Sequence, residues 1–306
     1  MSIFYLIIGL TLLAFSANWL VESAVTISKK MKLSSAVIGF TVVAAGTSMP
    51  ELATSVFAAL DGNSEIALGN VIGSNIFNIV GILGIAGIIT PNLINQNSKK
   101  IEIPMMMFSF IVILICSINL IISRIEGIMF LIILCFFVYY LIKNSKITHE
   151  IVEGHKNQNT LLTSFILIGS LIGLVVGSQF VLTGSIEIGK LLGLSDRVIG
   201  LTIVSIGTSL PEIGATVAAA IKGEKEMAVA NVVGSNLFNA FGILGITALA
   251  QPITVDPKFL STDLIFMMVA GLILWLLAFV KPTFHKKEGY FLISLTIGYL
   301  CYLTLS

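Results

Sequence analysis

A glutamate that follows a proline inside a long apolar segment occurs twice in this chain. The first copy reads GTSMPELATS from Gly46 and the second reads GTSLPEIGAT from Gly207, so aligning the two copies without a gap pairs Glu51 with Glu212. A carboxylate in an apolar membrane segment is costly to bury and usually belongs to a functional site. Repeated segments in membrane chains are typical of transporters whose binding site lies where the two halves meet. The pair therefore predicts one ion site to which each half gives a carboxylate.

The residues before each glutamate predict further oxygen ligands. Pro50 has no N–H and its ring clashes with the carbonyl of Gly46, so the helix is expected to break there and to free backbone carbonyls. Together with the hydroxyls of Thr47 and Ser48 and the Glu51 carboxylate, these carbonyls form a cluster of hard oxygen atoms. Such a cluster suits Ca²⁺, Na⁺ or Mg²⁺ and not soft metals. The second copy repeats these residue types at Gly207, Thr208, Ser209, Pro211 and Glu212.

A second repeated motif follows each of these copies. It reads GNVIGSNIFN in the first half and ANVVGSNLFN in the second. Ser74 and Asn78 are four residues apart and share one face of a helix, and Ser235 and Asn239 do likewise. Their hydroxyl and amide oxygens are expected to complete the cation site, with Asn75 and Asn236 beside them.

The composition places the chain in a membrane. Hydrophobic residues make up 56% of the 306 residues and charged residues only 11%, whereas a soluble domain carries about 25% charged residues. The net charge is +1 and no basic tract is present, so nucleic acid is not an expected partner. The first apolar segment has no preceding Lys or Arg, so we interpret it as a retained helix and not as a signal peptide. No cofactor and no enzymatic activity are expected, and the three cysteines lie singly in apolar runs at Cys116, Cys135 and Cys301.

Ten segments are long and apolar enough to cross a bilayer, which takes about 20 residues per helix. They cover residues 3–28, 34–60, 66–90, 102–122, 125–143, 160–190, 196–221, 226–250, 260–280 and 288–305. The predicted fold is an all-α multi-pass membrane protein with five spans in 1–143, a polar linker at 144–159 and five spans in 160–306. Because five is odd, the second repeat must enter the membrane from the opposite side, which makes the repeats inverted. Glu22 and Glu187 lie nearer the ends of their segments, where they can reach the interface, and are left out of the predicted site.

The basic residues predict the orientation in the cell membrane. If the chain begins outside, thirteen Lys and Arg residues fall in the inside loops and four in the outside loops. Cytoplasmic loops are enriched in positive charge. Both termini are therefore expected outside, with the linker in the cytoplasm.

The two doubled motifs, GTS(M/L)PE and (G/A)NV(I/V)GSN(I/L)FN, closely resemble the alpha repeats of the sodium/calcium exchanger family. This family lies within the calcium/cation antiporter superfamily, and the short central linker is similar to that of its prokaryotic members. The resemblance implies a secondary active antiporter that works by alternating access. It also implies that the first and sixth helices are a gating pair that slides across the other helices.

The resemblance implies a central cluster of ion positions. Glu51 and Glu212 match the carboxylates that bind Ca²⁺ and are shared with Na⁺. Thr47 and Thr208 match residues that give backbone carbonyls to Ca²⁺ and a side-chain oxygen to Na⁺. The other implied positions are Ser48 and Ser209 in the same turn, Ser74 and Ser235 as flanking Na⁺ ligands, Ala44 and Ser205 as carbonyl donors, and Asn78 in the middle.

The chain departs from the family at Asn239, where family members often carry Asp. The predicted site then has two carboxylates, whose charge balances one Ca²⁺. The departure leaves open how many Na⁺ ions are exchanged and whether the counter-ion is Na⁺ or H⁺.

Three other functions fit parts of this pattern. A Ca²⁺/H⁺ antiporter would use protonation of Glu51 and Glu212 in place of Na⁺ binding. A cation channel would take its selectivity from rings of carbonyls or charges. An intramembrane protease would need two paired catalytic acids, and the Thr/Ser/Pro-Glu clusters fit ion binding better. The expected partners are the lipid bilayer, Ca²⁺ and Na⁺, with H⁺ as the alternative, and no obligate protein partner is evident.

Overall fold

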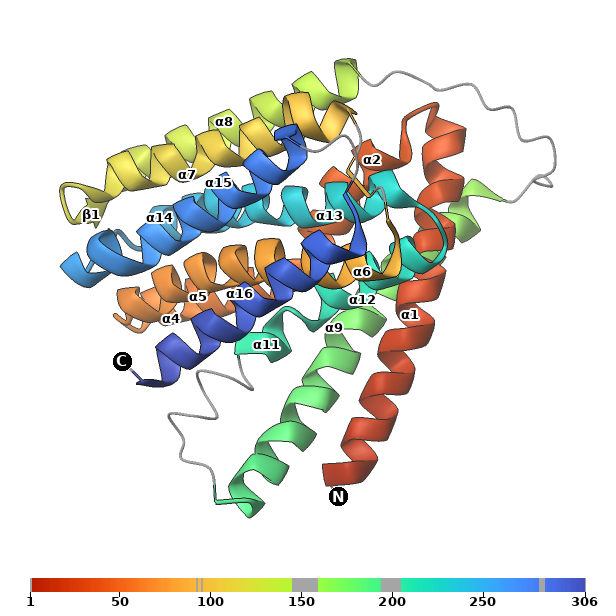
Figure 1. Ribbon diagram of the computed structural model, residues 1–306, viewed down its shortest axis with the longest axis horizontal. Coiled ribbons are helices and arrows are strands. Elements are labelled where there is room, and N and C mark those ends of the chain that lie inside the picture. The colour runs from red at the N-terminus through yellow and green to blue at the C-terminus, as the bar shows by residue number, and fades with distance from the viewer. Residues whose placement is uncertain are drawn as a thin grey trace.

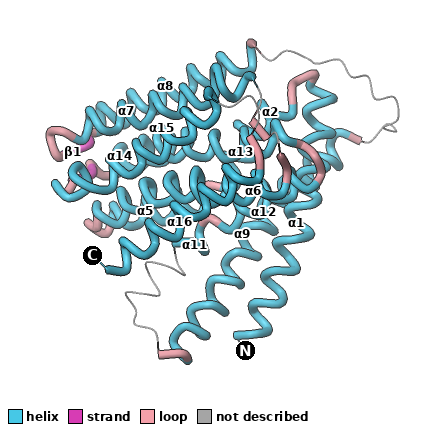
Figure 2. The backbone as a smooth tube through the Cα atoms, in the orientation of Figure 1, coloured by secondary structure: helices cyan, strands magenta, loops and turns pink. Residues whose placement is uncertain are grey.

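The computed structural model describes residues 2–91, 93–94, 96–144, 159–193, 205–280 and 284–305, and helices account for nearly all of them (Figures 1 and 2). Segments labelled η are π-helical, with hydrogen bonds between residues five apart. The elements of the first half are α1 (Ser2–Met31), α2 (Ser35–Ile38), η1 (Gly39–Val43), α3 (Ala44–Thr47), α4 (Met49–Leu60), α5 (Ser64–Phe77), η2 (Asn78–Ile82), α6 (Leu83–Ile89), η3 (Ser98–Glu102), α7 (Ile103–Ser117), β1 (Ile121–Ile122) and α8 (Arg124–Lys143). Those of the second half are α9 (Thr160–Leu191), α11 (Ser205–Thr208), α12 (Leu210–Ile221), α13 (Lys225–Leu237), η5 (Phe238–Ile243), α14 (Leu244–Ala250), β2 (Ile253–Thr254), η6 (Phe259–Asp263), α15 (Leu264–Val280) and α16 (Lys286–Leu305).

Seven of the helices in the described part of the chain are long and apolar enough to cross a membrane. An eighth is formed if residues 35–47 and α4, which meet at a bend of 45°, count as one span. Two other helices, α12 and α16, fall on the remaining predicted spans, 196–221 and 288–305. Residues 194–204 before α11 and the linker residues 145–158 lie outside the described residues, so the number ten stays a prediction.

The fourth predicted span, 102–122, is wrong at its end. The helix covers Ser98–Ser117. Leu120 then takes a positive φ of 64°, which ends the helical path. Ile121 and Ile122 pair antiparallel with the second half, in register with Thr254 and Ile253. This short ribbon depends on a partner far along the chain, so the apolar run alone could not reveal it.

Apart from the short strands, the described elements of the second half follow the order of their counterparts in the first half. In the gapless alignment that pairs Glu51 with Glu212, α4 and α12 begin and end at equivalent positions, and so do η3 and η6 as well as α6 and α14. α5 and α13 also begin at equivalent positions. The repeat in sequence is therefore a repeat in structure.

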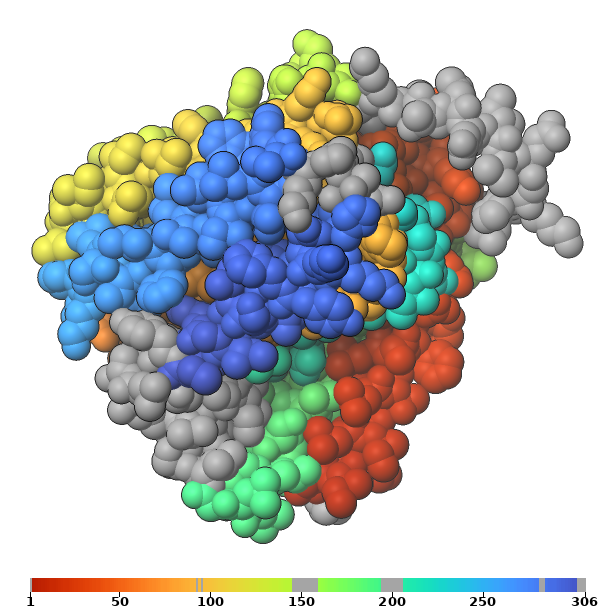
Figure 3. All heavy atoms as spheres, in the orientation of Figure 1, coloured from red at the N-terminus to blue at the C-terminus, as the bar shows by residue number. Residues whose placement is uncertain are grey.

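Helices α1 and α9 pack against each other in opposite directions. The Ser2 hydroxyl donates to Glu187 Oε2 at 2.6 Å near one end of the pair, and Lys30 Nζ donates to Thr160 Oγ1 at 3.2 Å at the other. Figure 1 shows the pair projecting from the rest of the molecule, and the space-filling view in Figure 3 agrees. Glycines let these backbones approach closely, as in many membrane helix pairs.

The centre of the molecule is formed by α5 and α13 with the segments that follow them. The most apolar stretch of Ser64–Ile89 is 72% buried and that of Lys225–Ala250 is 83% buried, against 28% for α1 and 17% for α8. A helix that is apolar all round and buried belongs to the interior, whereas α1 and α8 turn most of their apolar surface outward. The motif-bearing helices therefore lie where water and lipid are excluded.

The α1–α9 contact generates a stability prediction. A Cβ at Gly177 of α9 would lie 3.0 Å from Leu13 N and 3.1 Å from Gly9 O of α1. We expect Gly177→Leu to push the helices apart and to lower the midpoint temperature of unfolding in detergent, since overpacking costs about 1–3 kcal/mol. Gly169, on the same helix, has no neighbour within 4 Å of a Cβ, so Gly169→Leu is the control that should keep the midpoint unchanged. Equal midpoints for the two variants would show that the pair does not need this close approach.

Candidate functional site

Each half breaks its motif helix at a serine. α3 ends at Thr47, Ser48 has φ −82° and ψ 9°, and α4 starts at Met49, so that Pro50 takes the second position of the new helix. A proline is tolerated there because the N–H it lacks would have no helical partner. Ser209 repeats this geometry with φ −87° and ψ 7°. The predicted break is confirmed, two residues before the proline.

The break puts each glutamate in the first turn of a helix. Glu51 lies in the first turn of α4 and Glu212 in the first turn of α12. The N-terminal end of a helix carries a partial positive charge and free N–H groups, which favour a nearby carboxylate. Both side chains are only 1% exposed. The local fold therefore offers part of the stabilisation that a buried carboxylate requires.

The two glutamates are joined across the halves by the break serines. Ser48 Oγ donates to Glu212 Oε1 at 2.9 Å, and Ser209 Oγ donates to Glu51 Oε1 at 3.4 Å. Each serine therefore binds the carboxylate of the other half. The four side chains form a single buried cluster at the junction of the repeats.

Several buried oxygen atoms of the predicted site residues have no hydrogen-bond partner in the described part of the protein. Buried polar atoms are nearly always hydrogen-bonded, because leaving one unpaired is costly. A hard cation surrounded by such oxygens would satisfy them. The atoms concerned, on side chains at most 1% exposed, are Glu51 Oε2, Glu212 Oε2, Asn78 Oδ1, Asn239 Oδ1 and Ser235 Oγ.

This donor set suits Ca²⁺ or Na⁺. Two carboxylates and several neutral oxygens supply the ligands that these ions prefer, and no soft sulfur or imidazole ligand is among them. Within the described residues, no group of three or more His, Cys, Asp and Glu side chains is arranged to hold a metal. The negative charge at the cluster therefore comes from Glu51 and Glu212.

The last asparagine of each second motif lies in a π-helical turn. Asn78 opens η2, and Asn239 is the second residue of η5. Asn78 Nδ2 donates to Asn236 Oδ1 at 3.1 Å, which joins the two central helices. π-helical turns are rare and often occur at functional sites, where they redirect side chains.

The other predicted residues lie on α3, α5 and α11. Thr47 is fully buried and its hydroxyl donates to the Ala44 carbonyl at 3.2 Å. Ala44 also packs at Gly234, one residue before Ser235. Ser74 is 5% exposed and Thr208 is half-buried. Ser205 begins α11, and its side chain lies outside the described residues.

Sequence reasoning missed Asn70 and Asn231. Asn70 Nδ2 donates to the Glu51 carbonyl at 3.1 Å and to Ser55 Oγ at 2.9 Å, so it ties α5 to the first turn of α4. Asn231 Nδ2 donates to Thr216 Oγ1 at 2.8 Å in the other half. The signal was present, since both asparagines stand in register in the GNV and ANV segments of the repeated motif.

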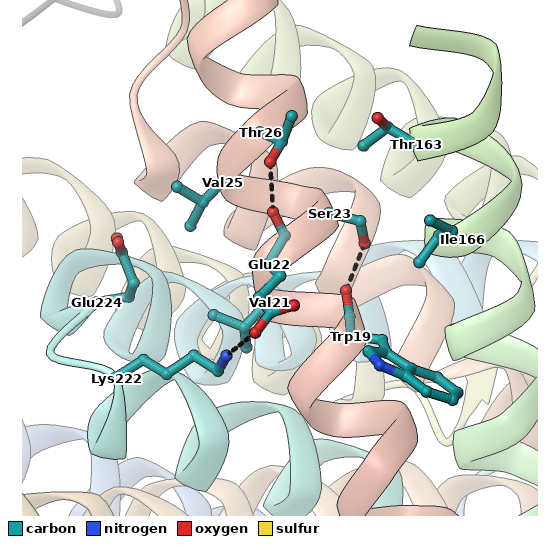
Figure 4. Close-up of a pocket in the computed structure, with 10 residues that line it drawn as sticks. All are labelled: Trp19, Val21, Glu22, Ser23, Val25, Thr26, Thr163, Ile166, Lys222 and Glu224. Carbon is teal, nitrogen blue, oxygen red and sulfur yellow. Dashed lines mark hydrogen bonds and ion pairs between the residues drawn. The ribbon is translucent and has the colours of Figure 1, made fainter. Parts of the chain in front are cut away.

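Glu22 has a partner that the sequence did not predict. It forms an ion pair with Lys222 at 2.6 Å, between α1 and the end of α12. The pair lies beside a pocket of about 500 Å³ that Trp19, Thr26 and Thr163 also line (Figure 4). None of the predicted site residues lines this pocket, so it is separate from the glutamate cluster.

Comparison with known proteins shows the family and the fold that this chain resembles. A family model described as sodium/calcium exchanger protein matches residues 1–143 and 162–305. The sodium/calcium exchanger MaX1 of Methanosarcina acetivorans is 31% identical, with 96% of each chain covered. The inner membrane protein YrbG of Escherichia coli is 31% identical over 98% of this chain and 95% of its own. A solved structure of the sodium-calcium exchanger NCX_Mj, soaked without Na⁺ and Ca²⁺, superimposes with a TM-score of 0.87 at 31% identity and 98% coverage of both chains.

Proposed function

The chain belongs to the sodium/calcium exchanger family, and from this premise we propose that it moves Ca²⁺ out of the cell in exchange for inward Na⁺ at the Glu51–Glu212 cluster. As a family member it is a multi-pass membrane protein and a transporter of the cation/Ca²⁺ antiport type. The ions are its substrates.

The crossed serine–glutamate bonds are the observation that carries the proposal. Because Ser48 binds Glu212 and Ser209 binds Glu51, one oxygen of each carboxylate is held while the other has no hydrogen-bond partner among the described residues. The two charges balance one Ca²⁺. Na⁺ ions that need the same oxygens compete with Ca²⁺, and that competition couples the two fluxes.

We assign the ligands residue by residue from the family resemblance. Glu51 and Glu212 would bind Ca²⁺ and share their oxygens with Na⁺, and the backbone carbonyls of Thr47 and Thr208 would complete the Ca²⁺ site. The helix breaks after these threonines support this role, since the carbonyls near a break are freed from regular helical bonding. The further assigned positions are Ser48, Ser209, Ala44, Ser205, Asn78 and Asn239, with Ser74 and Ser235 as flanking Na⁺ ligands.

Alternating access would come from α1 and α9 moving across the other helices. Their antiparallel packing supports an inverted repeat, because helices in corresponding places of the two halves run in opposite directions. The exchange of serine and glutamate partners between the halves is what an approximate two-fold axis produces. The predicted seventh span, 196–221, includes residues 196–204, which lie outside the described residues, so the full set of ten spans is part of the proposal.

The first test is the direction and coupling of flux. In liposomes loaded with Na⁺, the outwardly directed Na⁺ gradient should drive the purified protein to take up ⁴⁵Ca²⁺. A pH gradient of the same size should not drive this uptake. Uptake driven only by the pH gradient would show that the counter-ion is H⁺ and not Na⁺. Ca²⁺ flux that needs no counter-ion would indicate a channel.

Neutralising either glutamate is expected to abolish Ca²⁺ transport. Glu51→Gln and Glu212→Gln keep the shape of the side chain but remove half of the negative charge that balances Ca²⁺. The apparent Ca²⁺ affinity should therefore fall by about 100-fold or more. Glu65→Gln, at an exposed acid of α5, is the control and should transport normally. The measurement is Na⁺-driven ⁴⁵Ca²⁺ flux with the unfolding midpoint recorded for each variant. Normal flux in a glutamate variant would remove that residue from the site.

The proposed orientation can be tested by cysteine labelling. In a chain whose native cysteines are replaced, Asn157→Cys in the linker should react with a membrane-impermeant maleimide only from the cytoplasmic side. Asn63→Cys, in the exposed turn between α4 and α5, should react from outside and serves as the control. Labelling of the linker from outside would reverse the orientation and overturn the argument from positive charges.

Asn239→Asp is expected to make transport depend more steeply on pH. Asn239 is 1% exposed and neither of its amide atoms has a hydrogen-bond partner in the described part of the chain. An acid there would be a third carboxylate in one buried cluster, where coupled acids share protons and protons compete with cations. Na⁺-driven Ca²⁺ flux should therefore fall more in the variant than in the original chain as the pH is lowered from about 8 to 6. Superimposable pH profiles would show that position 239 does not sense the ion site.

A further inference from the structure

Two buried asparagines in the central helices use methionine sulfur as an acceptor. Asn236 Nδ2 donates to Met106 Sδ at 3.3 Å, and Asn75 Nδ2 donates to Met267 Sδ at 3.7 Å. All four side chains have no exposed surface. The alignment that pairs Glu51 with Glu212 also pairs the two asparagines with each other and the two methionines with each other. A thioether is a weak acceptor, so a methionine in such a place would ordinarily be read as packing.

In one pair the contact extends to the ion site. Asn236 gives its N–H₂ group to Met106, and its oxygen accepts from Asn78 Nδ2 at 3.1 Å. The Asn78 amide is thereby turned with its N–H₂ group toward Asn236. Its oxygen, Asn78 Oδ1, is then the buried atom without a hydrogen-bond partner in the described residues.

The orientation matters because the two ends of an amide have nearly the same shape but opposite roles. The oxygen accepts hydrogen bonds and can bind a cation, whereas the N–H₂ group only donates and repels one. Packing alone does not distinguish the two ends. Among the contacts of Asn236, the Met106 sulfur distinguishes them, because it can accept a hydrogen bond only from the N–H₂ group.

The second pair is not extended in this way. Asn75 Oδ1 has no hydrogen-bond partner among the described residues, and neither amide atom of Asn239 has one. The two central amides are therefore held unequally, although the sequence repeats them in register.

We propose that Met106 is a positioning residue that, through Asn236, turns the oxygen of Asn78 toward the transported cation. This rests on the proposed function of the glutamate cluster as a Ca²⁺ and Na⁺ site. Without the sulfur, the N–H₂ group of Asn236 would be buried with no acceptor. Flipping Asn236 would let that group donate to Asn78, whose oxygen would turn toward it and whose own N–H₂ group would then face the ion.

The test compares three leucine substitutions and one glutamine substitution in the full chain. Met106→Leu keeps the volume and removes the acceptor, which cores usually tolerate. Met106→Gln has a similar length and restores an acceptor oxygen. Met107→Leu is the packing control on the same helix, since it removes a buried sulfur that has no hydrogen bond to an asparagine among the described residues. Met267→Leu tests the corresponding pair of the other half.

We expect Met106→Leu to raise the KM for Ca²⁺ about tenfold, with the maximal rate changed less than about twofold. Met106→Gln should restore the KM to within about twofold of the original chain, and Met107→Leu and Met267→Leu should leave it there. The readouts are Na⁺-driven ⁴⁵Ca²⁺ flux over a range of Ca²⁺ concentrations and the Ca²⁺-dependent rise of the unfolding midpoint.

The possible outcomes separate this inference from the proposed function. An original chain that neither transports Ca²⁺ nor is stabilised by it would overturn the function of the site. An original chain that does both, with an unchanged KM in Met106→Leu, would overturn the positioning role alone. Equal losses in Met106→Leu and Met107→Leu, or a folded Met106→Gln that fails to restore the KM, would also overturn it, because packing would then account for the effect.

Discussion

Two carboxylates must be kept in a place from which water is excluded, and the rest of the structure is arranged around that requirement. An isolated buried charge would cost far more than a protein's net stability. The helix breaks at Ser48 and Ser209 offset part of this cost. Each break places a glutamate at a helix N-terminus, and its serine hydroxyl donates a hydrogen bond to the carboxylate of the other half. The remaining oxygens suit a cation, so the proposed binding of an ion would also stabilise the centre of the protein.

This arrangement also explains why the repeat is needed. One half contains a glutamate and a serine, but its serine binds the carboxylate of the other half. A single repeat would present one charge and a misplaced hydroxyl. Two repeats together bring two carboxylates and two hydroxyls into one buried cluster, and the two carboxylates would balance the charge of one divalent cation.

The sequence reveals the features that depend on local pattern. The apolar runs locate the helices to within a few residues, Pro50 and Pro211 predict the breaks, and the doubling points to a shared site. Features that depend on tertiary contact are not visible there. The ribbon at Ile121 and Ile122 needs a partner from the second half, and the sulfur contact of Asn236 needs α7 to pass beside α13. Asn70 lies between these cases, since its repetition was visible but its bond to the Glu51 carbonyl was not.

One contact between the halves has no counterpart in the repeat, although the two halves are otherwise closely similar. Under the proposed alternating access between inverted repeats, the halves would exchange arrangements, so a contact of α1 with α12 would be replaced by one of α9 with α4. The ion pair between Glu22 and Lys222 belongs to the first contact. The residues at the corresponding positions are Thr183 and Asp61, which cannot form an ion pair. Glu22 is 59% exposed and Lys222 25%, so solvent weakens their attraction. An exposed pair contributes at most about 1 kcal/mol, roughly a fivefold bias between two states. A bias of that size favours one state without trapping it, as a transporter that must visit both requires.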